Sequence, residues 1–437
     1  MDLGRTRIQC SDCGNIYPRL GEIPILLPDP ETYLASCRGQ LALLDVHASK
    51  AAQIIEEQLQ APDVLPLTRG RCEAMIEVIR RQATDVRSLV EPLLPAATSS
   101  VPDSDVHEDF PAPLEYLHYI YRDWGWPGEQ NGENERALAS VDAVLERQPL
   151  GRMIVLGAGA CRLAYDLHRR DPTADTLVLD IDPFLFAVAH KVVRGGTVSV
   201  REANWEIDEM RHVVREWKLE ARNGAIGEDR FHFMLADGLE PPLLPGTFDT
   251  VLTPWFIDLV PDDLPDLIST IHRLLKPGGR WLNLGPLRYT PDTPAAQRFT
   301  REEVFDLAGR AGFKTGKWQT DTAPYLVSKL NGRGKVEWVL AFGASRLNTP
   351  TPDGTHDDDP HAWLIFHHLP IPTLSTESLS LPRTPLSEII VPAIDGTRTL
   401  NELASLVAAE AGESNLSMTQ IRSVVRRCLA ELFQGRN

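Results

Sequence analysis

The clearest pattern along the chain is an apolar run, broken by turn residues, between positions 248 and 289. It predicts a buried strand, a polar turn, an amphipathic helix, a glycine-rich turn and a second buried strand. Apolar strands that end in polar residues are typical of a parallel α/β sheet, in which ligands bind at the carboxyl ends of the strands. The polar residues at these two ends are Asp258, Asn283, Arg288 and Tyr289. We therefore expect a mostly parallel sheet with a polar ligand at this edge.

An apolar strand farther upstream runs into the turn Gly157-Ala158-Gly159, and an amphipathic helix follows. The two glycines permit a tight turn and let a ligand approach the backbone closely. Asp180 ends the next strand, where a carboxylate can accept hydrogen bonds from a ribose diol. A further strand ends at Asp237, where an adenine amino group could be bound. The spacing predicts a nucleoside-containing cofactor.

Two classes of cofactor use this arrangement. Dinucleotide folds place a third glycine at the start of the helix, where the phosphates bind. Arg162 occupies that position here and is too bulky for the close helix–strand contact. The order of strand-end acids resembles instead the class I methyltransferases that use S-adenosyl-L-methionine, and the run 275–279 (LKPGG) before a strand is a frequent companion. The alternative is a doubly wound domain that binds no nucleotide.

Several motifs resemble more narrowly those of the carnosine N-methyltransferase family. They are YRDW at 121–124, FID at 256–258 and NLGPLRY at 283–289, within a similarity that covers about residues 115–345. The resemblance implies a Rossmann-like, mostly parallel α/β sheet and an S-adenosylmethionine-dependent N-methyltransferase. It also implies that the methyl acceptor is an imidazole nitrogen of histidine, of a histidine-containing dipeptide or of a histidine in a peptide.

The resemblance further implies roles for single residues. Asp258 would face the imidazole of the substrate, with Tyr289 and Tyr325 nearby. Arg122 would reach the carboxylate of the cofactor, while Asp180 would hold the ribose and Asp237 the adenine. The full set implied to bind the cofactor is Arg122, Gly157, Ala158, Gly159, Asp180, Ile181, Asp237, Gly238 and Pro254.

The chain departs from the family pattern at three positions. Thr290 stands where the family has a histidine, Asp180 stands where it usually has glutamate, and Trp338 stands where a smaller or phenolic aromatic is expected. Two of these positions belong to the substrate side. They leave open a methyltransferase of a peptide or natural-product pathway that acts on another nitrogen, oxygen or sulfur.

Purely structural roles are the alternatives for the same residues. Asp258 could cap the helix that follows it, since aspartate is a favoured N-cap residue. Arg122 could pair with Asp123 on a surface helix, where an ion pair contributes little. The two tyrosines could be core aromatics with a hydroxyl at the rim. Asp182, directly before Pro183, is predicted to start a helix rather than to bind a ligand.

Composition excludes several functions. The chain has 437 residues, of which 44 are basic and 61 acidic, and the resulting net charge of −17 opposes binding to nucleic-acid phosphates. There is no run of 18 apolar residues and no apolar signal segment, so we expect a soluble, cytoplasmic protein without membrane contact. Six scattered cysteines do not form the spacing of a disulfide framework.

The amino-terminal flank divides into two predicted parts. Residues 1–30 resemble the short zinc-ribbon-like segment at the start of some methyltransferases and methyltransferase activator subunits. Cys10 and Cys13 supply two of the four ligands that zinc needs, so we expect a metal-free remnant rather than a zinc site. Residues 31–110 have helical spacing and are predicted to cover the methyltransferase domain, 111–347.

The carboxyl-terminal flank begins with a predicted linker, 348–384, that contains a run rich in proline, threonine and aspartate. Residues 385–437 are predicted to form a strand, a turn at Asp395-Gly396 and two or three helices, as in a small winged-helix domain. The segment looks like PqqD-like peptide-binding modules. The alternative is a packing or homodimerisation element.

Overall fold

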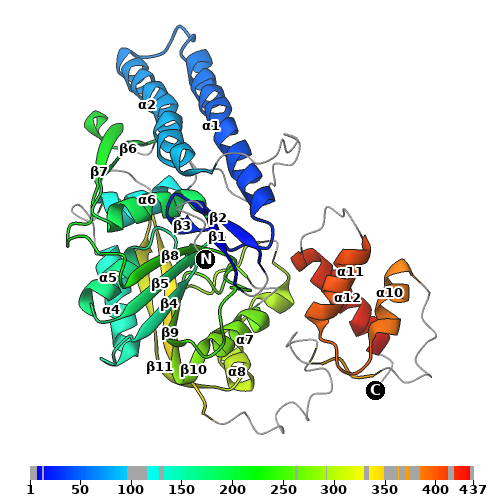
Figure 1. Ribbon diagram of the computed structural model, residues 1–437. Helices are drawn as coiled ribbons and strands as arrows, with labels where there is room; N and C mark the ends of the chain where they lie inside the picture. Colours follow the sequence, from blue (N-terminus) through cyan, green and yellow to red (C-terminus); the bar gives the residue numbers. More distant parts are fainter. Residues whose placement is uncertain are drawn as a thin grey trace.

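The computed structural model describes residues 7–433 except 12–13, 96–115, 127–131, 206, 261–263, 292, 329–333, 349–362, 364–369, 374–383 and 412–417. Its centre is a seven-stranded sheet (Figure 1). The strands are β4 (Arg152–Leu156), β5 (Asp175–Asp180), β8 (Phe231–Leu235), β9 (Phe248–Pro254), β10 (Leu275–Gly285), β11 (Phe313–Tyr325) and β12 (Lys335–Arg346).

The order of strands across the sheet is β11-β12-β10-β9-β4-β5-β8. Neighbours from β10 to β8 pair in parallel, whereas β12 is antiparallel to both β10 and β11. This is the strand order of class I methyltransferases. The predicted fold class is therefore confirmed.

Helices cover both faces of the sheet, and each face has its own core (Figure 1). Val251 and Leu252, which are adjacent on β9, belong to opposite cores because successive side chains of a strand point to opposite faces. Both are fully buried, which explains the continuous apolar run in the sequence. The helices are α4 (Glu133–Leu145), α5 (Arg162–Arg170) and α6 (Pro183–Val193) on one face, and α7 (Leu264–Leu274) and α8 (Arg301–Arg310) on the other.

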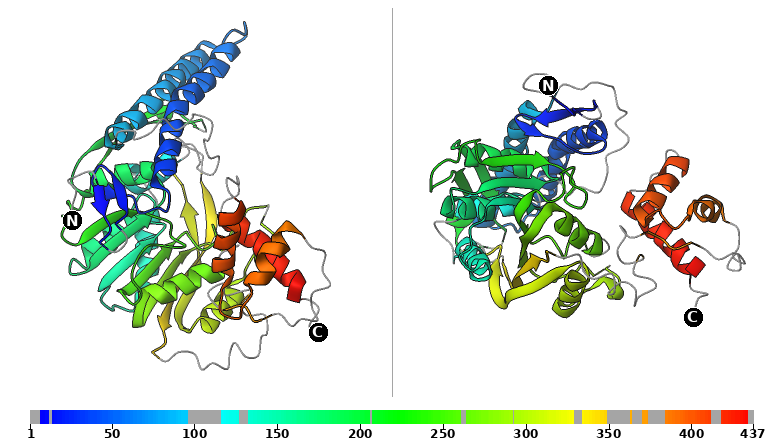
Figure 2. Two further views of the ribbon diagram at one scale, coloured as in Figure 1. Left: turned by 45° about the vertical axis from the view of Figure 1, so that its right-hand side comes forward. Right: turned by 60° about the horizontal axis from the view of Figure 1, so that its bottom comes forward.

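The amino-terminal region forms a small sheet and a helical hairpin. The sheet contains β1 (Arg7–Gln9), β2 (Ile16–Leu20) and β3 (Ile23–Pro24), and it continues the central sheet through a parallel bridge between Ile25 and Leu235. Helices α1 (Pro30–Gln58) and α2 (Pro66–Val90) then project together from the core (Figure 2). A hairpin that the sequence did not suggest, β6 (Val198–Ala203) with β7 (Val214–Leu219), packs against α2.

The carboxyl-terminal region is mostly helical where it is described, and an isolated β-bridge joins Pro370 to Thr399. Helices α10 (Pro385–Ala393), α11 (Leu400–Ala411) and α12 (Met418–Phe433) share a separate apolar core. The strand predicted before Asp395 is wrong, because a capping box at Thr384 and a proline in the first turn start α10 there. Most of the predicted linker lies outside the described residues.

Within the part of the chain that the structure describes, no helix combines the length and the apolar composition needed to cross a membrane.

Candidate active site

The glycine turn after β4 has the geometry that the sequence predicted. Gly157 and Gly159 both have positive φ, 67° and 55°. A Cβ on Gly157 would lie 2.5 Å from the ring of Phe256, whereas a Cβ on Gly159 would meet nothing within 4 Å. The turn therefore needs glycine at 157 for steric reasons, while the backbone at 159, with Ala158 beside it, borders open space.

Asp180 at the end of β5 is tied to this turn. Its Oδ2 accepts a hydrogen bond from the backbone N–H of Gly159 (2.7 Å), and its Oδ1 accepts from Ile181 (2.8 Å) and Asp182 (2.9 Å). Burial raises the pKa of Asp180. Each carboxylate oxygen can accept about two hydrogen bonds, so Oδ2 retains capacity for a hydroxyl of a ligand. Asp182 caps α6 through Leu185 N–H (2.6 Å), as predicted.

The ends of β8 and β9 meet at the ring of Phe256. A Cβ on Gly238 would lie 2.8 Å from that ring, so Phe256 packs against this glycine as well as against Gly157. Asp237 accepts a hydrogen bond from Leu239 N–H (2.8 Å) and thereby closes the turn after β8. Pro254 is buried as the last residue of β9. The structure thus gathers three strand ends around one aromatic ring.

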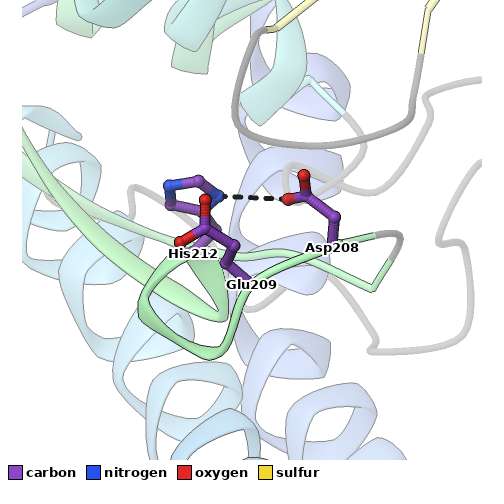
Figure 3. Close-up of side chains that lie close together, drawn as sticks. All are labelled: Asp208, Glu209 and His212. Atoms are coloured by element: carbon purple, nitrogen blue, oxygen red, sulfur yellow. Dashed lines mark ion pairs between the residues drawn. The ribbon is translucent and has the colours of Figure 1, made fainter.

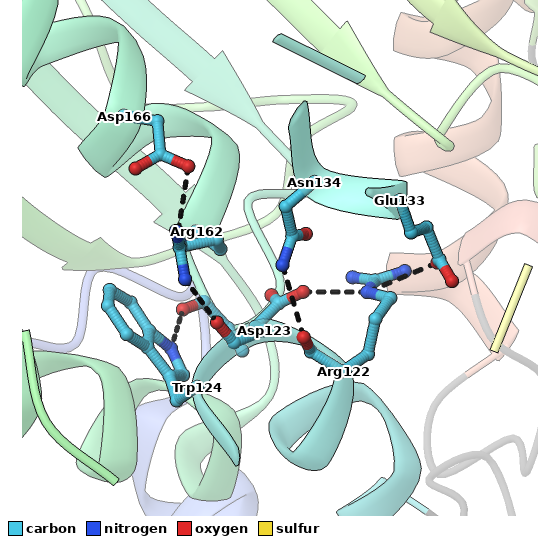
Figure 4. Close-up of polar contacts among 8 residues, drawn as sticks. Arg122, Asp123, Trp124, Glu133, Asn134, Arg162 and Asp166 are labelled. Atoms are coloured by element: carbon cyan, nitrogen blue, oxygen red, sulfur yellow. Dashed lines mark hydrogen bonds and ion pairs between the residues drawn. The ribbon is translucent and has the colours of Figure 1, made fainter. Parts of the chain in front are cut away.

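Arg122 lies in a single π-helical turn, Tyr121–Gly125, a feature that often marks functional sites. Its guanidinium pairs with Asp123 (2.6 Å) and lies 3.8 Å from Glu133 (Figure 4). The rings of Tyr119, Trp255 and Tyr325 lie within 6 Å of it.

The alternative of a surface ion pair does not describe Arg122, because the side chain is largely buried. Burial lowers the pKa of Arg122, but the carboxylates of Asp123 and Glu133 outweigh that effect and hold the pKa above its ordinary value. The guanidinium is therefore a fixed cation beside the exits of β9 and β11.

Sequence reasoning missed the two residues that tie this segment to the glycine turn. Arg162 donates to the carbonyl of Asp123 (2.8 Å) and to the carboxylate of Asp166 (2.7 Å), and Trp124 donates to the carbonyl of Ala160 (2.8 Å) (Figure 4). The sequence feature that could have indicated this role was Arg162, a bulky residue at the position of a third glycine. It fixes the position of the Arg122 segment against the turn.

Asp258 lies in the turn after β9 and is only 8% exposed. Burial raises the pKa of its carboxyl to about 6. The backbone N–H of Arg288, at the exit of β10, lies 3.4 Å from its Oδ2. Helix α7 begins six residues later at Leu264, so Asp258 does not cap it. A buried acid without a capping role is available to a polar ligand.

The predicted substrate tyrosines, Tyr289 and Tyr325, are both half-buried. Tyr289 donates to the carbonyl of Phe299 (3.0 Å), and burial, followed by the charge of Asp258, raises its pKa. Tyr325 lies under the ammonium of Lys335 (4.8 Å to the ring centroid) and beside Trp255. The structure brings Tyr325 together with Arg122 and Tyr289 together with Asp258.

Asn283 has a structural role. Its side chain is fully buried, accepts from Thr253 Oγ1 (2.9 Å) and donates to the carbonyl of Leu340 (3.3 Å). Both positions that depart from the family pattern on the substrate side, Thr290 and Trp338, are exposed.

Of the two cysteines in the expected metal-free remnant, only Cys10 is described, since Cys13 lies outside the described residues. Cys10 forms a backbone turn with Asn15 and Gly14. Figure 3 shows a separate group, Asp208, Glu209 and His212, whose ligand atoms lie within 4.8 Å of one another. The two acids of this group are exposed and Glu209 already pairs with Arg211, so the group does not indicate a metal site.

Comparison with known proteins agrees with this geometry. Residues 227–331 match the family model described as carnosine N-methyltransferase. A carnosine N-methyltransferase of Drosophila melanogaster is 28% identical over 198 residues, which are 40% of this chain and 41% of that protein. The carnosine N-methyltransferase of Rattus norvegicus is 54% identical over 71 residues, 16% of this chain and 18% of that protein.

The chain thus spans less than half the length of the curated relatives it matches. Among solved structures, a methyltransferase from Methanosarcina mazei aligns with a TM-score of 0.34 at 14% identity, over 46% of this chain and 95% of that one. Residues 227–331 are thus similar to the carnosine N-methyltransferase family, and they lie within a sheet of the class I methyltransferase fold.

Proposed function

We propose that the protein is an S-adenosylmethionine-dependent N-methyltransferase that acts on an imidazole nitrogen of histidine, of a histidine-containing dipeptide or of a histidine in a peptide. The observation that supports this most is Asp258. It is a buried carboxylate at the carboxyl end of β9, inside the segment that matches the family. The other acids at strand ends, Asp180 and Asp237, are proposed to bind the cofactor rather than the substrate.

The residues around the strand ends fit the cofactor. The open backbone at Gly159 and the remaining acceptor capacity of Asp180 suit a ribose, and Asp237 suits an adenine amino group. Arg122 supplies the cation for a carboxylate. Ile181, Gly238 and Pro254 would form the walls of this site. S-adenosylmethionine, when bound, supplies an electrophilic methyl group.

The role of Asp258 follows from imidazole chemistry. An imidazole with a pKa of about 6.5 is largely neutral at pH 7, so it needs orientation more than deprotonation. Asp258 accepts the N–H of one ring nitrogen, and this bond fixes the tautomer and directs the lone pair of the other nitrogen outward. As that nitrogen gains the methyl group, the ring becomes positively charged, and the carboxylate stabilises the charge. The ring proton then leaves through Asp258 or solvent.

Two measurements test the proposal separately. Isothermal titration should detect S-adenosylhomocysteine binding that is weakened at least tenfold in Asp180→Ala. Methyl transfer to histidine, carnosine or histidine peptides should be lost in Asp258→Asn, which should still bind S-adenosylhomocysteine. Absence of transfer to every imidazole acceptor would contradict the substrate assignment, and absence of binding would contradict the cofactor assignment.

A second candidate is a methyltransferase of a peptide pathway that uses another nitrogen, oxygen or sulfur acceptor. The exposed Trp338, at a position where the family resemblance predicts a smaller aromatic, favours a substrate other than a bare dipeptide. Mass spectrometry of the methylated peptide product would identify the modified atom and decide between the two.

A further inference from the structure

A groove is lined in part by Arg288, whose backbone N–H lies 3.4 Å from Oδ2 of Asp258. Its volume is about 600 Å³, within the range of about 300–1,000 Å³ that is usual for ligand pockets. The exit of β10, the first part of β12, one residue of β11 and the start of α8 line it. The lining residues that matter below are Leu287, Arg288, Arg301, Lys335, Glu337 and Trp338.

The groove is longer than a dipeptide. Pairing of β10 with β12 ends at Gly285 and Leu340, whereas β12 begins five residues earlier, at Lys335. Residues 335–340 all belong to β12, and most of them line the groove. Five steps along a strand cover about 17 Å, whereas an extended dipeptide reaches at most about 7 Å. The groove can therefore hold an extended peptide of about five residues.

This part of β12 also presents a strand edge. Among the described residues its register partners belong to β11, from Tyr325 opposite Lys335 to Thr320 opposite Leu340. Extended peptides bind such edges by adding a strand, and the side chains beside the edge select the sequence. The exposed apolar side chains beside it are Val336 and Trp338, which are 70% and 71% exposed.

Charge selects the kind of peptide. Arg288 and Lys335 both pair with the same oxygen, Oε1 of Glu337, at 2.9 and 2.5 Å. The Glu337 side chain is 5% exposed, whereas the two cations face solvent. Two cations that share one carboxylate leave one positive charge over, whereas Arg301, farther along the groove, already pairs with Glu302. The chain as a whole has a net charge of −17, so this local excess of positive charge distinguishes the groove from the rest of the protein.

We propose that the groove binds an extended peptide with acidic side chains, and that the histidine methylated at Asp258 belongs to such a peptide rather than to a dipeptide. The backbone N–H of Arg288 contacts Asp258, so one chain can place its imidazole at the acid and its carboxylates at Arg288 and Lys335. The identity of the histidine rests on the proposed function. The binding of an acidic peptide to the groove does not.

The test uses pentapeptides and the dipeptide β-alanyl-histidine. Each pentapeptide has one histidine, at its amino or its carboxyl end, and either two glutamates or two glutamines. Isothermal titration in the presence of S-adenosylhomocysteine measures binding, and methyl transfer is assayed separately. The better of the two glutamate peptides should bind at least tenfold more tightly than its glutamine counterpart and the dipeptide. Lys335→Met should remove most of the preference for glutamate over glutamine, whereas Trp338→Ala should weaken the binding of both pentapeptides relative to the dipeptide.

Lys276→Met is the matched control. Lys276 is 44% exposed and pairs with Asp249 at the amino ends of β9 and β10, whereas Lys335 is 46% exposed and lies at the opposite edge. The control should keep the preference, and unchanged S-adenosylhomocysteine affinity shows that the variants are folded.

The outcomes separate the two proposals. Glutamate and glutamine peptides that bind equally, or a glutamate preference that survives Lys335→Met, would overturn the peptide groove even if the dipeptide is methylated. Tight binding of the glutamate peptide without methyl transfer would support the groove and contradict the imidazole acceptor.

Discussion

At the residue scale, the side chain of Phe256 determines the shape of the site. The ring of Phe256 fills the space that a side chain would need at both Gly157 and Gly238. Phe256 also lies two residues before Asp258, so the same ring that fixes the glycine turns fixes the start of the turn that carries the acid. The cofactor and substrate halves of the site are thus coupled through one aromatic side chain.

Gly157→Ala should destabilise the protein, because it combines a positive φ with a 2.5 Å contact to Phe256. We expect a loss of about 2–4 kcal/mol in the free energy of unfolding, measured by urea denaturation. Gly159→Ala is the control, since it has a similar φ and no contact, and should lose about 1–2 kcal/mol. Equal losses for the two variants would contradict the steric role of Phe256.

The buried carboxyl of Asp258 should make stability depend on pH. Its pKa in the folded protein is about 6, above the ordinary 3.8, so folding favours the protonated form. The stability that this group contributes is present below pH 4 and is lost as the pH rises through 6. Asp258→Asn should therefore become more stable relative to the wild type between pH 4 and 7, by up to about 3 kcal/mol.

Chemical denaturation at several pH values measures this difference. Asp321→Asn, at an exposed position of β11, is the control variant. A difference between Asp258→Asn and the wild type that stays constant from pH 4 to 7 would show that Asp258 is not held in a desolvated environment.

At the scale of helices and strands, the sequence predicts those elements that a local pattern of apolar and polar residues determines. The apolar strands and their polar ends predicted the sheet, the ligand edge and the positions of Gly157, Asp180 and Asp258. The pairing of Arg162 with the carbonyl of Asp123 was not predictable, because it joins segments 39 residues apart that share no local pattern. The strand predicted before Asp395 is wrong because the capping box at Thr384 and the proline that follows it start a helix there.

The link between α5 and the Arg122 segment can be tested through Arg162. Arg162→Met removes charge-assisted bonds to Asp123 and Asp166 in a largely buried place, and should cost about 2 kcal/mol of stability. Arg310→Met is the control, because Arg310 makes an ion pair of the same length and spacing with Asp306 on the surface of α8. That variant should lose less than about 0.5 kcal/mol.

Affinity for S-adenosylhomocysteine should fall in Arg162→Met and stay unchanged in Arg310→Met. An Arg162→Met variant with wild-type stability and affinity would mean that the segment 121–125 holds its position without α5.

On the scale of the whole molecule, the amino-terminal region is joined to the cofactor side of the sheet. The hydroxyl of Tyr33, on α1, donates to the carbonyl of Ile181 (2.8 Å), directly after Asp180. Ile25 and Leu26 contact Leu235 at the end of β8. At the other end of the chain, Arg422 of α12 pairs with Glu240 (3.1 Å). The flanks therefore attach near the loops that form the site.

Tyr33→Phe should report on this attachment. Loss of one buried hydrogen bond should cost about 1 kcal/mol of stability and weaken S-adenosylhomocysteine binding, because the Ile181 loop loses its support. Tyr165→Phe removes an equivalent bond to the carbonyl of Gly224 (2.7 Å) and should cost similar stability with unchanged affinity. Equal affinities for both variants and the wild type, by isothermal titration, would rule out a role for α1 in cofactor binding.

The bridge between Ile25 and Leu235 also has a consequence for synthesis of the chain. Its two halves are 210 residues apart, and ribosomes add about 5–20 residues per second. The amino-terminal strand therefore emerges about 10–40 seconds before the edge that it completes. During that interval the segment can pair with β2 on one side only, and the nascent chain must keep its other edge from other partners until β8 arrives.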